Sequence, residues 1–390
     1  MVKSQPKIQE SLDNRSDWNR EFVLWMADSE RGFVLSMDNS DRRTEVMLEL
    51  NAVRKTAISI LSHSPDPIVR FRLLRDVLRL PENDSDLTQA RSDVGQSRWV
   101  KELRHEHWTD GSWGRLHGKD YGAKQKIGTT EFGVQRALAL GLDADHPILK
   151  GASHYLAGIL KGTILCRDRP EINDRWPTGL QLIAAATLAQ IQPDHPLLDD
   201  VWNLWLTIVH KTFASGAYDP EAEIRVHQEL TGASVKNSYL VIDNKYTLIL
   251  LSSRPDALPF NLEAMLLNWI WHKEDGIGYL RARLARPPHY LKKGQIECWV
   301  TSLELLSRFS GWRILAHDAI QWLWNKRTDE ELWDLGPRTT YSAALPLSEN
   351  WRKKLSRQFD WTTRMLGLLH CYYADSGSGN PDGRSNLSSS

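Results

Sequence analysis

The chain alternates between turn-rich loops and apolar segments of helical length from about residue 45 to residue 373. Within the segments, apolar residues recur with the 3.6-residue period of a helix, and the strict alternation of a half-buried strand is scarce. Six segments share one pattern, in which a turn-rich loop leads into a predominantly apolar helix. They begin at Asp66, Thr129, Asp174, Tyr239, Gln295 and Arg357. The starts are roughly 45 to 65 residues apart, which is the period of a helical hairpin.

More amphipathic segments lie between the apolar ones, at about residues 45–61, 86–106, 147–160, 196–213, 261–272 and 311–325. An amphipathic helix packs on an apolar neighbour with one face and meets water with the other. The alternation therefore predicts an all-α fold in which six hairpins close into an (α/α)6 toroid, with the apolar helices inside and the amphipathic helices outside. An open solenoid of the same hairpins is the alternative. The ring is favoured because neither end carries a polar capping repeat.

One stretch, "DGSWG" at Asp110–Gly114, predicts a tight corner between two helices. Gly111 and Gly114 allow backbone conformations that are closed to other residues, so Trp113 between them is expected to anchor the loop. Looser relatives of this stretch, "SGAYD", "DGIGY" and "ELWDLG", also follow an amphipathic segment and precede an apolar one. The corner is therefore expected to be a repeated feature of the fold.

The two ends of the chain lack the hairpin pattern. Residues 1–43 are mixed and polar, and we expect them to form an N-terminal extension packed on the body. Residues 44–373 form the predicted toroid domain. Residues 374–390 are of low complexity and are predicted to be disordered.

The composition mainly argues against certain classes of protein. The 49 basic and 49 acidic residues cancel, so no overall field favours nucleic acid. The N-terminus shows no signal peptide, and no apolar run is long enough for a transmembrane segment. The three cysteines are far apart, as is usual in a reducing compartment, so a cytoplasmic protein is expected. Monomer and dimer both stay open.

The "DGSWG" corner, a hairpin period of roughly 55 residues and the tryptophan-rich loops together resemble the terpenoid cyclase/protein prenyltransferase superfamily, whose members fold as α/α toroids. The stretches "DPIVRFRLLRDVL" and "ELWDLGPRTTYSAALPLSENWRKK" are similar to segments of squalene-cyclase-like proteins in that group. The resemblance covers roughly residues 45–373. It implies a cavity enzyme, but the Asp-x-Asp-Asp and Asp-Cys-Thr-Ala-Glu motifs that start catalysis in known cyclases are absent.

Every apolar helix carries one carboxylate near its start. Asp66 and Asp174 are expected to be helix caps, because acids there accept unpaired N–H groups and suit the helix dipole. Four other acids lie deeper in apolar sequence, where a carboxyl group must be paired or protonated and could act as a general acid. These candidate catalytic residues are Glu131, Asp243, Glu297 and Asp360, and structural ion pairing is the alternative for each.

The 17 tryptophans exceed what core packing alone leads one to expect. Aromatic faces can stabilise a developing positive charge or stack on a ligand. The candidate substrate-binding residues are Trp113, Trp176, Tyr239, Tyr246, Trp299, Trp361 and Arg364. Packing between helices is the alternative for every aromatic residue in this set.

Together these features predict a cyclase in natural-product biosynthesis that needs no cofactor and acts on a hydrophobic small molecule, a terpenoid or other polyene. It would work by acid-assisted cyclisation or by a shape-controlled intramolecular cycloaddition of the Diels–Alder type. No metal is expected, since Glu297, Cys298 and His317 only distantly match the zinc ligands of prenyltransferases. Two alternatives remain, a carbohydrate-active lyase or hydrolase on an α/α barrel and a non-catalytic toroid that binds a hydrophobic ligand or a protein.

Overall fold

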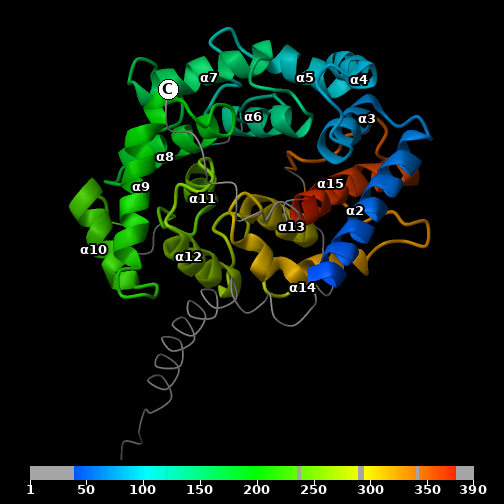
Figure 1. The fold of residues 1–390 in the computed structure, drawn as a ribbon. Helices are drawn as coiled ribbons and strands as arrows, with labels where there is room; N and C mark the ends of the chain where they lie inside the picture. Colours follow the sequence, from blue (N-terminus) through cyan, green and yellow to red (C-terminus); the bar gives the residue numbers. More distant parts are fainter. Residues whose placement is uncertain are drawn as a thin grey trace, which may run out of the picture.

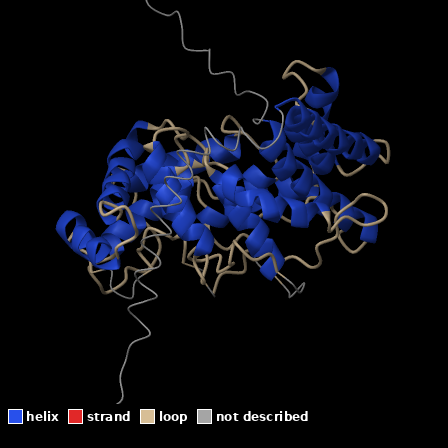
Figure 2. Cartoon of the chain, turned by 60° about the horizontal axis from the view of Figure 1, so that its bottom comes forward, coloured by secondary structure: helices blue, strands red, loops and turns tan. Residues whose placement is uncertain are grey.

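The computed structural model describes residues 39–118, 120, 122–234, 239–288, 294–339 and 342–374. Within these ranges the regular structure is helical and contains no strand, so the predicted all-α class is confirmed (Figure 2). Most of the expected N-terminal extension and nearly all of the expected tail lie outside the described residues. Across the part of the chain that is described, no helix has an apolar stretch long enough to cross a membrane.

Each of the six predicted apolar segments contains a helix. They are α3 (Pro67–Arg72), which continues as a π-helical turn η1 (Leu73–Val77), α6 (Thr130–Ala139), α8 (Trp176–Ala189), α11 (Lys245–Leu251), α13 (Gln295–Leu306) and α15 (Lys354–Ala374). In α11 every residue from Tyr246 to Leu251 is buried, and in α8 the same holds from Leu182 to Ala189. A helix that is apolar on all sides belongs in the interior of a protein.

The amphipathic segments also form helices, with two departures from the predicted pattern. Their bounds are α2 (Asn39–Leu61), α4 (Ser85–Gln96), α5 (Arg98–Glu106), α7 (Pro147–Leu160), α9 (Asp199–Thr212) after the 3-10 turn η2 (Pro196–Leu198), α10 (Pro220–Thr231), α12 (Phe260–His272) and α14 (Trp312–Trp324). The segment predicted at 86–106 is divided at Ser97, whose extended backbone and side-chain oxygen cap α5. Helix α10 is an addition that the periodicity did not separate.

The helices are arranged around the middle of the molecule (Figure 1). Helices α6, α8, α11, α13 and α15 border the middle, and α5, α7, α9, α12 and α14 lie outside them. Helix α7 packs against both α6 and α8, and α11 packs against both α8 and α13. Helix α15 packs against α2 and α3, so the end of the described chain meets its beginning.

The "DGSWG" corner is as tight as the sequence predicts. Gly111 has φ +89°, and a Cβ atom there would lie 2.1 Å from the carbonyl oxygen of Gly151, so only glycine fits. Trp113 is fully buried. Its indole N–H donates to the carbonyl of Leu103 at 3.0 Å, and its backbone N–H donates to Thr130 Oγ1 at 3.1 Å. The tryptophan thus ties α5 to the start of α6.

A second corner, at Trp333, repeats this arrangement. The Trp333 indole N–H donates to the carbonyl of Leu323 at 2.8 Å, again ten positions earlier in the chain. Its backbone N–H donates to Thr362 Oγ1 at 2.9 Å. The corner in "ELWDLG" therefore ties α14 to α15 as the corner in "DGSWG" ties α5 to α6.

The two acids that were expected to cap helices make a different contact. The Asp66 side chain makes no capping bond to α3 and accepts instead from the backbone N–H of Glu349 at 3.2 Å. Asp174 accepts from the backbone N–H of Ser234 at 3.0 Å. Both carboxylates therefore hold a neighbouring loop, a role that sequence position alone does not distinguish from capping.

Candidate active site

Glu131 lies in the first turn of α6, beside the loop that follows the Trp113 corner. The loop and the helix are joined by two backbone bonds, Thr130 N–H to Arg115 O at 2.7 Å and Glu131 N–H to Leu116 O at 3.0 Å. Both donors are N–H groups that a helix cannot satisfy internally at its start. The loop residue after Leu116 is His117, which is thereby brought to the Glu131 side chain.

The Glu131 carboxylate is the centre of a cluster of side chains from three parts of the chain, Glu131, His117, Lys245 and Tyr246, called here the Glu131 cluster. One oxygen, Oε2, lies 2.8 Å from His117 Nδ1 and accepts the Tyr246 hydroxyl at 2.8 Å. The other, Oε1, accepts Lys245 Nζ at 2.6 Å and Gln135 Nε2 at 3.0 Å. Lys245 and Tyr246 begin α11, whose capping Asn244 side chain accepts from the backbone N–H groups of Tyr246 and Thr247.

Glu131 is ionised in this setting. Burial opposes its charge, but Lys245 and His117 outweigh that effect and hold the pKa of Glu131 well below its usual range. Tyr246 responds in the opposite direction, because burial and the Glu131 charge raise its pKa well above the usual value. Tyr246 therefore keeps its proton and serves Glu131 as a hydrogen-bond donor.

The partners of His117 assign its tautomer. Glu131 is an acceptor only, so the short contact requires the proton on Nδ1. The Tyr246 hydroxyl, 2.9 Å from the same Nδ1, then accepts from His117 while donating to Glu131. In the neutral ring this tautomer leaves the lone pair on Nε2, and the His117 side chain is 35% exposed whereas that of Glu131 is 7% exposed. A partly exposed imidazole whose tautomer is fixed by a buried carboxylate is the arrangement that a general base needs.

His117 is also held through its backbone by Asp168. The buried Asp168 carboxylate accepts from three successive N–H groups, Leu116 at 2.5 Å, His117 at 3.1 Å and Gly118. A Cβ atom at position 118 would lie 2.8 Å from Asp168 Oδ1, so a larger residue there would displace the Asp168 side chain. The imidazole is thus fixed at both its ring and its main chain.

Among the predicted site residues, Glu131 and Tyr246 meet in this cluster, and Tyr239 lies in the same region. The Tyr239 hydroxyl donates to Glu171 Oε2 at 3.1 Å and lies 3.1 Å from the position of a Cβ atom at Gly179. Burial raises the pKa of Tyr239 to about 12. Trp176 is half-buried at the start of α8.

The other predicted acids hold loops or form ion pairs elsewhere. Asp243 pairs with Lys273 at 3.0 Å, and burial raises its pKa although Lys273 opposes the shift. Glu297 accepts from the backbone N–H of Thr339 and the hydroxyl of Ser342. Glu297 therefore fastens the loop that precedes α15.

Asp360 is completely buried and is also a loop fastener. It accepts from Leu347 N–H at 2.6 Å, from Ser348 N–H at 3.0 Å and from Ser348 Oγ at 2.5 Å. Burial raises its pKa to about 6, and these hydrogen bonds oppose the rise. Arg364, from the same helix, binds Glu304 with two bonds of 2.6 Å and lies 3.8 Å from Glu297.

The remaining predicted tryptophans are packed in the core. Trp113, Trp299 and Trp361 have no exposed surface, and each donates its indole N–H to a backbone carbonyl. These contacts are those of loop anchors. Their contact with a substrate stays a prediction.

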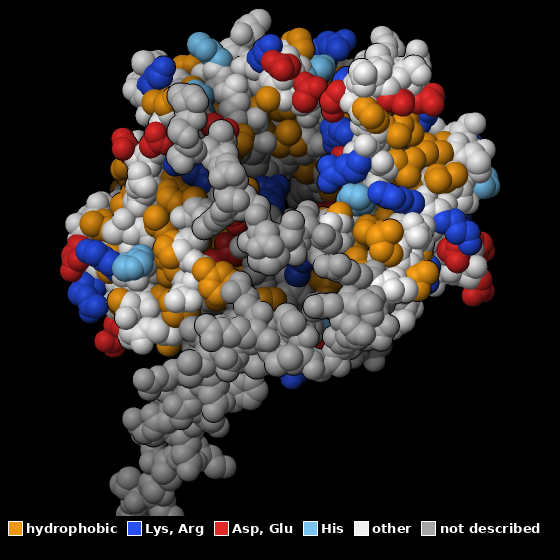
Figure 3. All heavy atoms as spheres, in the orientation of Figure 1, with side chains coloured by type: hydrophobic (Ala, Val, Ile, Leu, Met, Phe, Trp, Pro, Cys, Tyr) orange, Lys and Arg blue, Asp and Glu red, His pale blue; other side chains and the backbone are white. Residues whose placement is uncertain are grey.

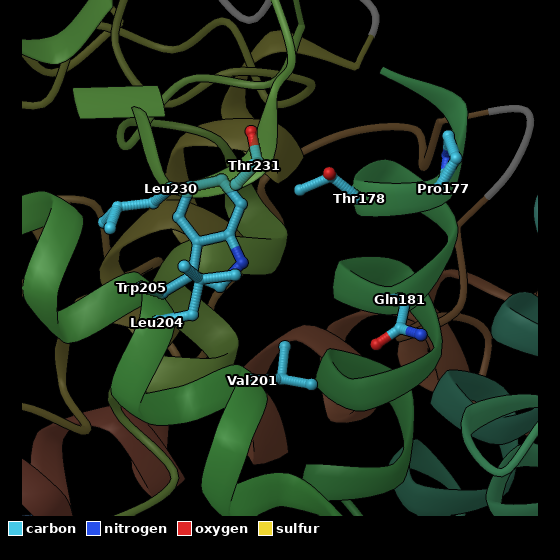
Figure 4. Close-up of a pocket in the computed structure, with 8 residues that line it drawn as sticks. All are labelled: Pro177, Thr178, Gln181, Val201, Leu204, Trp205, Leu230 and Thr231. Carbon is cyan, nitrogen blue, oxygen red and sulfur yellow. The ribbon is translucent and has the colours of Figure 1, made fainter. Parts of the chain in front are cut away.

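A separate pocket of about 220 Å³ lies between α8, α9 and the end of α10 (Figure 4). Its lining residues are Pro177, Thr178, Gln181, Val201, Leu204, Trp205, Leu230 and Thr231. It is smaller than the roughly 300–1,000 Å³ of typical ligand pockets, and it contains no member of the Glu131 cluster. The face drawn in Figure 3 is hollowed at its middle, with Lys and Arg side chains on the wall of the hollow.

Sequence reasoning missed His117 and Lys245. His117 lies in a loop, and its signal is its place four residues after the corner tryptophan; Lys245 follows a helix-capping asparagine. Within the described ranges, no three His, Cys, Asp or Glu side chains are grouped so that they could hold a metal ion. No family model, no curated protein and no solved structure matches this chain.

Proposed function

We propose that this chain is an enzyme in which His117 acts as a general base and Glu131 orients it. The observation that carries the proposal is the 2.8 Å contact between His117 Nδ1 and Glu131 Oε2, with the His117 ring partly exposed and the carboxylate buried. The same division of roles operates wherever a carboxylate fixes the tautomer of a catalytic histidine. Positioned proton transfer of this kind contributes roughly 10²- to 10⁴-fold to a rate.

We propose that the site is set in an (α/α)6 toroid like those of the terpenoid cyclase superfamily. The alternation of apolar and amphipathic helices, the packing of α15 on α2 and α3, and the equivalent corners at Trp113 and Trp333 support this arrangement. The first turns of α6 and α11, which carry Glu131, Lys245 and Tyr246, belong to helices that border the middle of the molecule (Figure 1).

The reaction that this site fits best is proton abstraction from a polar, hydroxylated small molecule, as in a carbohydrate-active lyase. His117, Lys245 and the Tyr239–Glu171 pair offer hydrogen bonds and charge, which a sugar can use and a hydrocarbon cannot. Glu131 is held as an anion by Lys245, so it cannot supply the strong acid that protonates an alkene.

Cyclisation of a terpenoid or polyene is the second candidate, and the ring contact between Tyr246 and Tyr279, at 5.1 Å, favours it. These aromatic faces could fold a polyene chain. Because Glu131 is ionised, such a reaction would proceed by shape-controlled cycloaddition and not by proton-initiated cyclisation.

Two substrate panels test the proposal, one of uronic-acid oligosaccharides and one of linear polyenes. Wild type, His117→Ala, Glu131→Gln and the control His210→Ala, an exposed histidine on α9, are compared by mass spectrometry and by the ultraviolet absorbance of a new conjugated double bond. We expect the oligosaccharides to react and the rate to fall by about 10³-fold in His117→Ala. Turnover that survives this substitution would contradict the proposal.

A further inference from the structure

The loop between α12 and α13 is fastened to the start of α11, next to the Glu131 cluster. Gly278 N–H donates to the carbonyl of Asp243 at 2.9 Å, and Lys245 N–H donates to the carbonyl of Gly278 at 3.3 Å. A Cβ atom at position 278 would lie 3.2 Å from Asn244 Cα. The residue that follows, Tyr279, is therefore held at a fixed place beside the cluster.

Tyr279 has an unusual backbone for a bulky residue. Its φ is +71°, in the left-handed region that favours glycine. Such conformations cost free energy and persist where the surrounding structure imposes them, often at functional sites. Glycine would fit this backbone without strain, so the fold of the loop does not itself require a tyrosine side chain.

The strained backbone directs the ring of Tyr279 onto the cluster. The ring lies edge-on to His117, with centroids 5.7 Å apart, and to Tyr246 at 5.1 Å. Lys245 Nζ lies 5.7 Å from its centroid. Tyr279 thus covers one side of His117 while remaining 42% exposed.

The tyrosines of this region differ in what their hydroxyl groups do. The Tyr246 hydroxyl is bound by Glu131 and His117, and the Tyr239 hydroxyl is bound by Glu171. No residue of the described ranges hydrogen-bonds the Tyr279 hydroxyl. Burial, and then the neighbouring Tyr239 and Glu131, raise the pKa of Tyr279, so its proton is retained at neutral pH.

We propose that the Tyr279 hydroxyl is the proton donor to the substrate, on the other side of the reacting bond from His117. The assignment rests on the proposed function of His117. His117 Nε2 takes a proton from a substrate carbon, and the electron pair of that C–H bond forms the new C=C bond. The C–O bond then breaks with its electron pair on the departing oxygen, which receives the proton of Tyr279. The imidazolium then returns its proton to the phenolate through solvent, so no co-reactant is consumed.

Whether the side chains of His117 and Tyr279 converge on one point can be tested without a substrate. Zinc and similar ions bind imidazole nitrogen at roughly 2.1 Å. Two histidines whose ring centres are 5.7 Å apart, as those of His117 and Tyr279 are, can therefore share one ion. We expect Tyr279→His to bind Co²⁺ at least about tenfold more tightly than wild type, with the visible bands of a coordinated ion. His117→Ala added to this variant should abolish the gain. A folded Tyr279→His protein with wild-type Co²⁺ affinity would overturn the assignment.

A second variant guards against misfolding of the first. Tyr279→Gly relieves the strained backbone and uncovers His117, so diethyl pyrocarbonate should modify His117 at least about threefold faster than in wild type, as followed by peptide mass spectrometry. An unchanged rate of His117 modification in Tyr279→Gly would contradict the role of Tyr279 and leave the proposed role of His117 intact. A His117 that resists the reagent in every variant would instead overturn the proposed function, so the two failures are distinguishable.

Discussion

The corners at Trp113 and Trp333 have the same packing but different chemistry. In both, a buried indole donates to the carbonyl ten residues earlier, and the tryptophan backbone N–H donates to a threonine of the apolar helix that follows. That threonine is Thr130 at the start of α6 and Thr362 within α15. The residue after Thr130 is Glu131, whereas the residue after Thr362 is Thr363, which simply donates to the carbonyl of Phe359 at 2.8 Å.

The loops that leave the two corners differ in the same way. Four residues after Trp113 stands His117, and four residues after Trp333 stands Pro337. The second corner is built without an acid–base pair, so the packing of a corner does not require Glu131 or His117. Glu131 and His117 therefore serve something other than the packing of the corner, and proton transfer is the role that we propose for them.

The largest expected effect is shared by both corners. Trp113→Ala and Trp333→Ala should each lower the free energy of unfolding by about 3–5 kcal/mol, because each leaves a large cavity and an unpaired carbonyl. Urea unfolding followed by circular dichroism measures the loss. If one substitution proved nearly neutral, the two corners would not be equivalent.

The next effect should separate the corners. Glu131→Gln should cost about 2 kcal/mol at pH 7, since it leaves Lys245 without its charge partner while Lys245 stays partly exposed. The pKa of Glu131 is lowered by folding from its ordinary 4.5, so its contribution is present above about pH 4.5 and is lost as the pH falls.

The difference in unfolding free energy between wild type and Glu131→Gln should therefore shrink between pH 7 and pH 3. Thr363→Val is the matched control at the second corner, because no titrating group is removed there and its effect should not change with pH. A pH-independent effect of Glu131→Gln would show that Glu131 is not the ionised partner of Lys245.

A smaller effect should again be common to both corners. Thr130→Val and Thr362→Val each remove the hydroxyl that accepts the backbone N–H of the corner tryptophan, with little change in side-chain shape. We expect a loss of about 1–2 kcal/mol from each in the same urea experiment. Unequal losses of more than about 1 kcal/mol would mean that one threonine has an additional role.

The smallest effect on stability is expected at His117, the residue that we propose as the general base. His117→Ala removes a partly exposed ring and leaves Glu131 with Lys245, Tyr246 and Gln135, so the cost should be below about 1 kcal/mol. Thermal unfolding provides the measurement. A loss as large as that of Trp113→Ala would make His117 a structural residue.

Much of the helical architecture could be predicted from the sequence, because helix periodicity and the glycine–tryptophan corner are local signals. Glu131 could be identified for the same reason, as a charged residue in an apolar helix. The choice among four such acids could not be made, because it depends on partners: Asp360 faces the backbone of one loop, and Glu131 faces side chains from distant segments.

His117 and Tyr279 could not be predicted, because distant residues position both of them. His117 is fixed by Asp168, 51 positions later, and Tyr279 by a backbone contact with residues 243–245. No periodic pattern records such contacts. The tryptophans could not be sorted for a related reason, since abundance along the chain does not distinguish an anchor in the core from a ring at a binding surface.

The most direct test of the account is the tautomer of His117, observed by ¹⁵N NMR of the histidine-labelled protein and assigned with His117→Ala. We predict that the neutral form of the ring carries its proton on Nδ1 and leaves Nε2 free, and that this preference is lost in Glu131→Gln. A proton on Nε2 in the wild type would contradict the account, since the nitrogen open to substrate would then have no lone pair with which to act as a base.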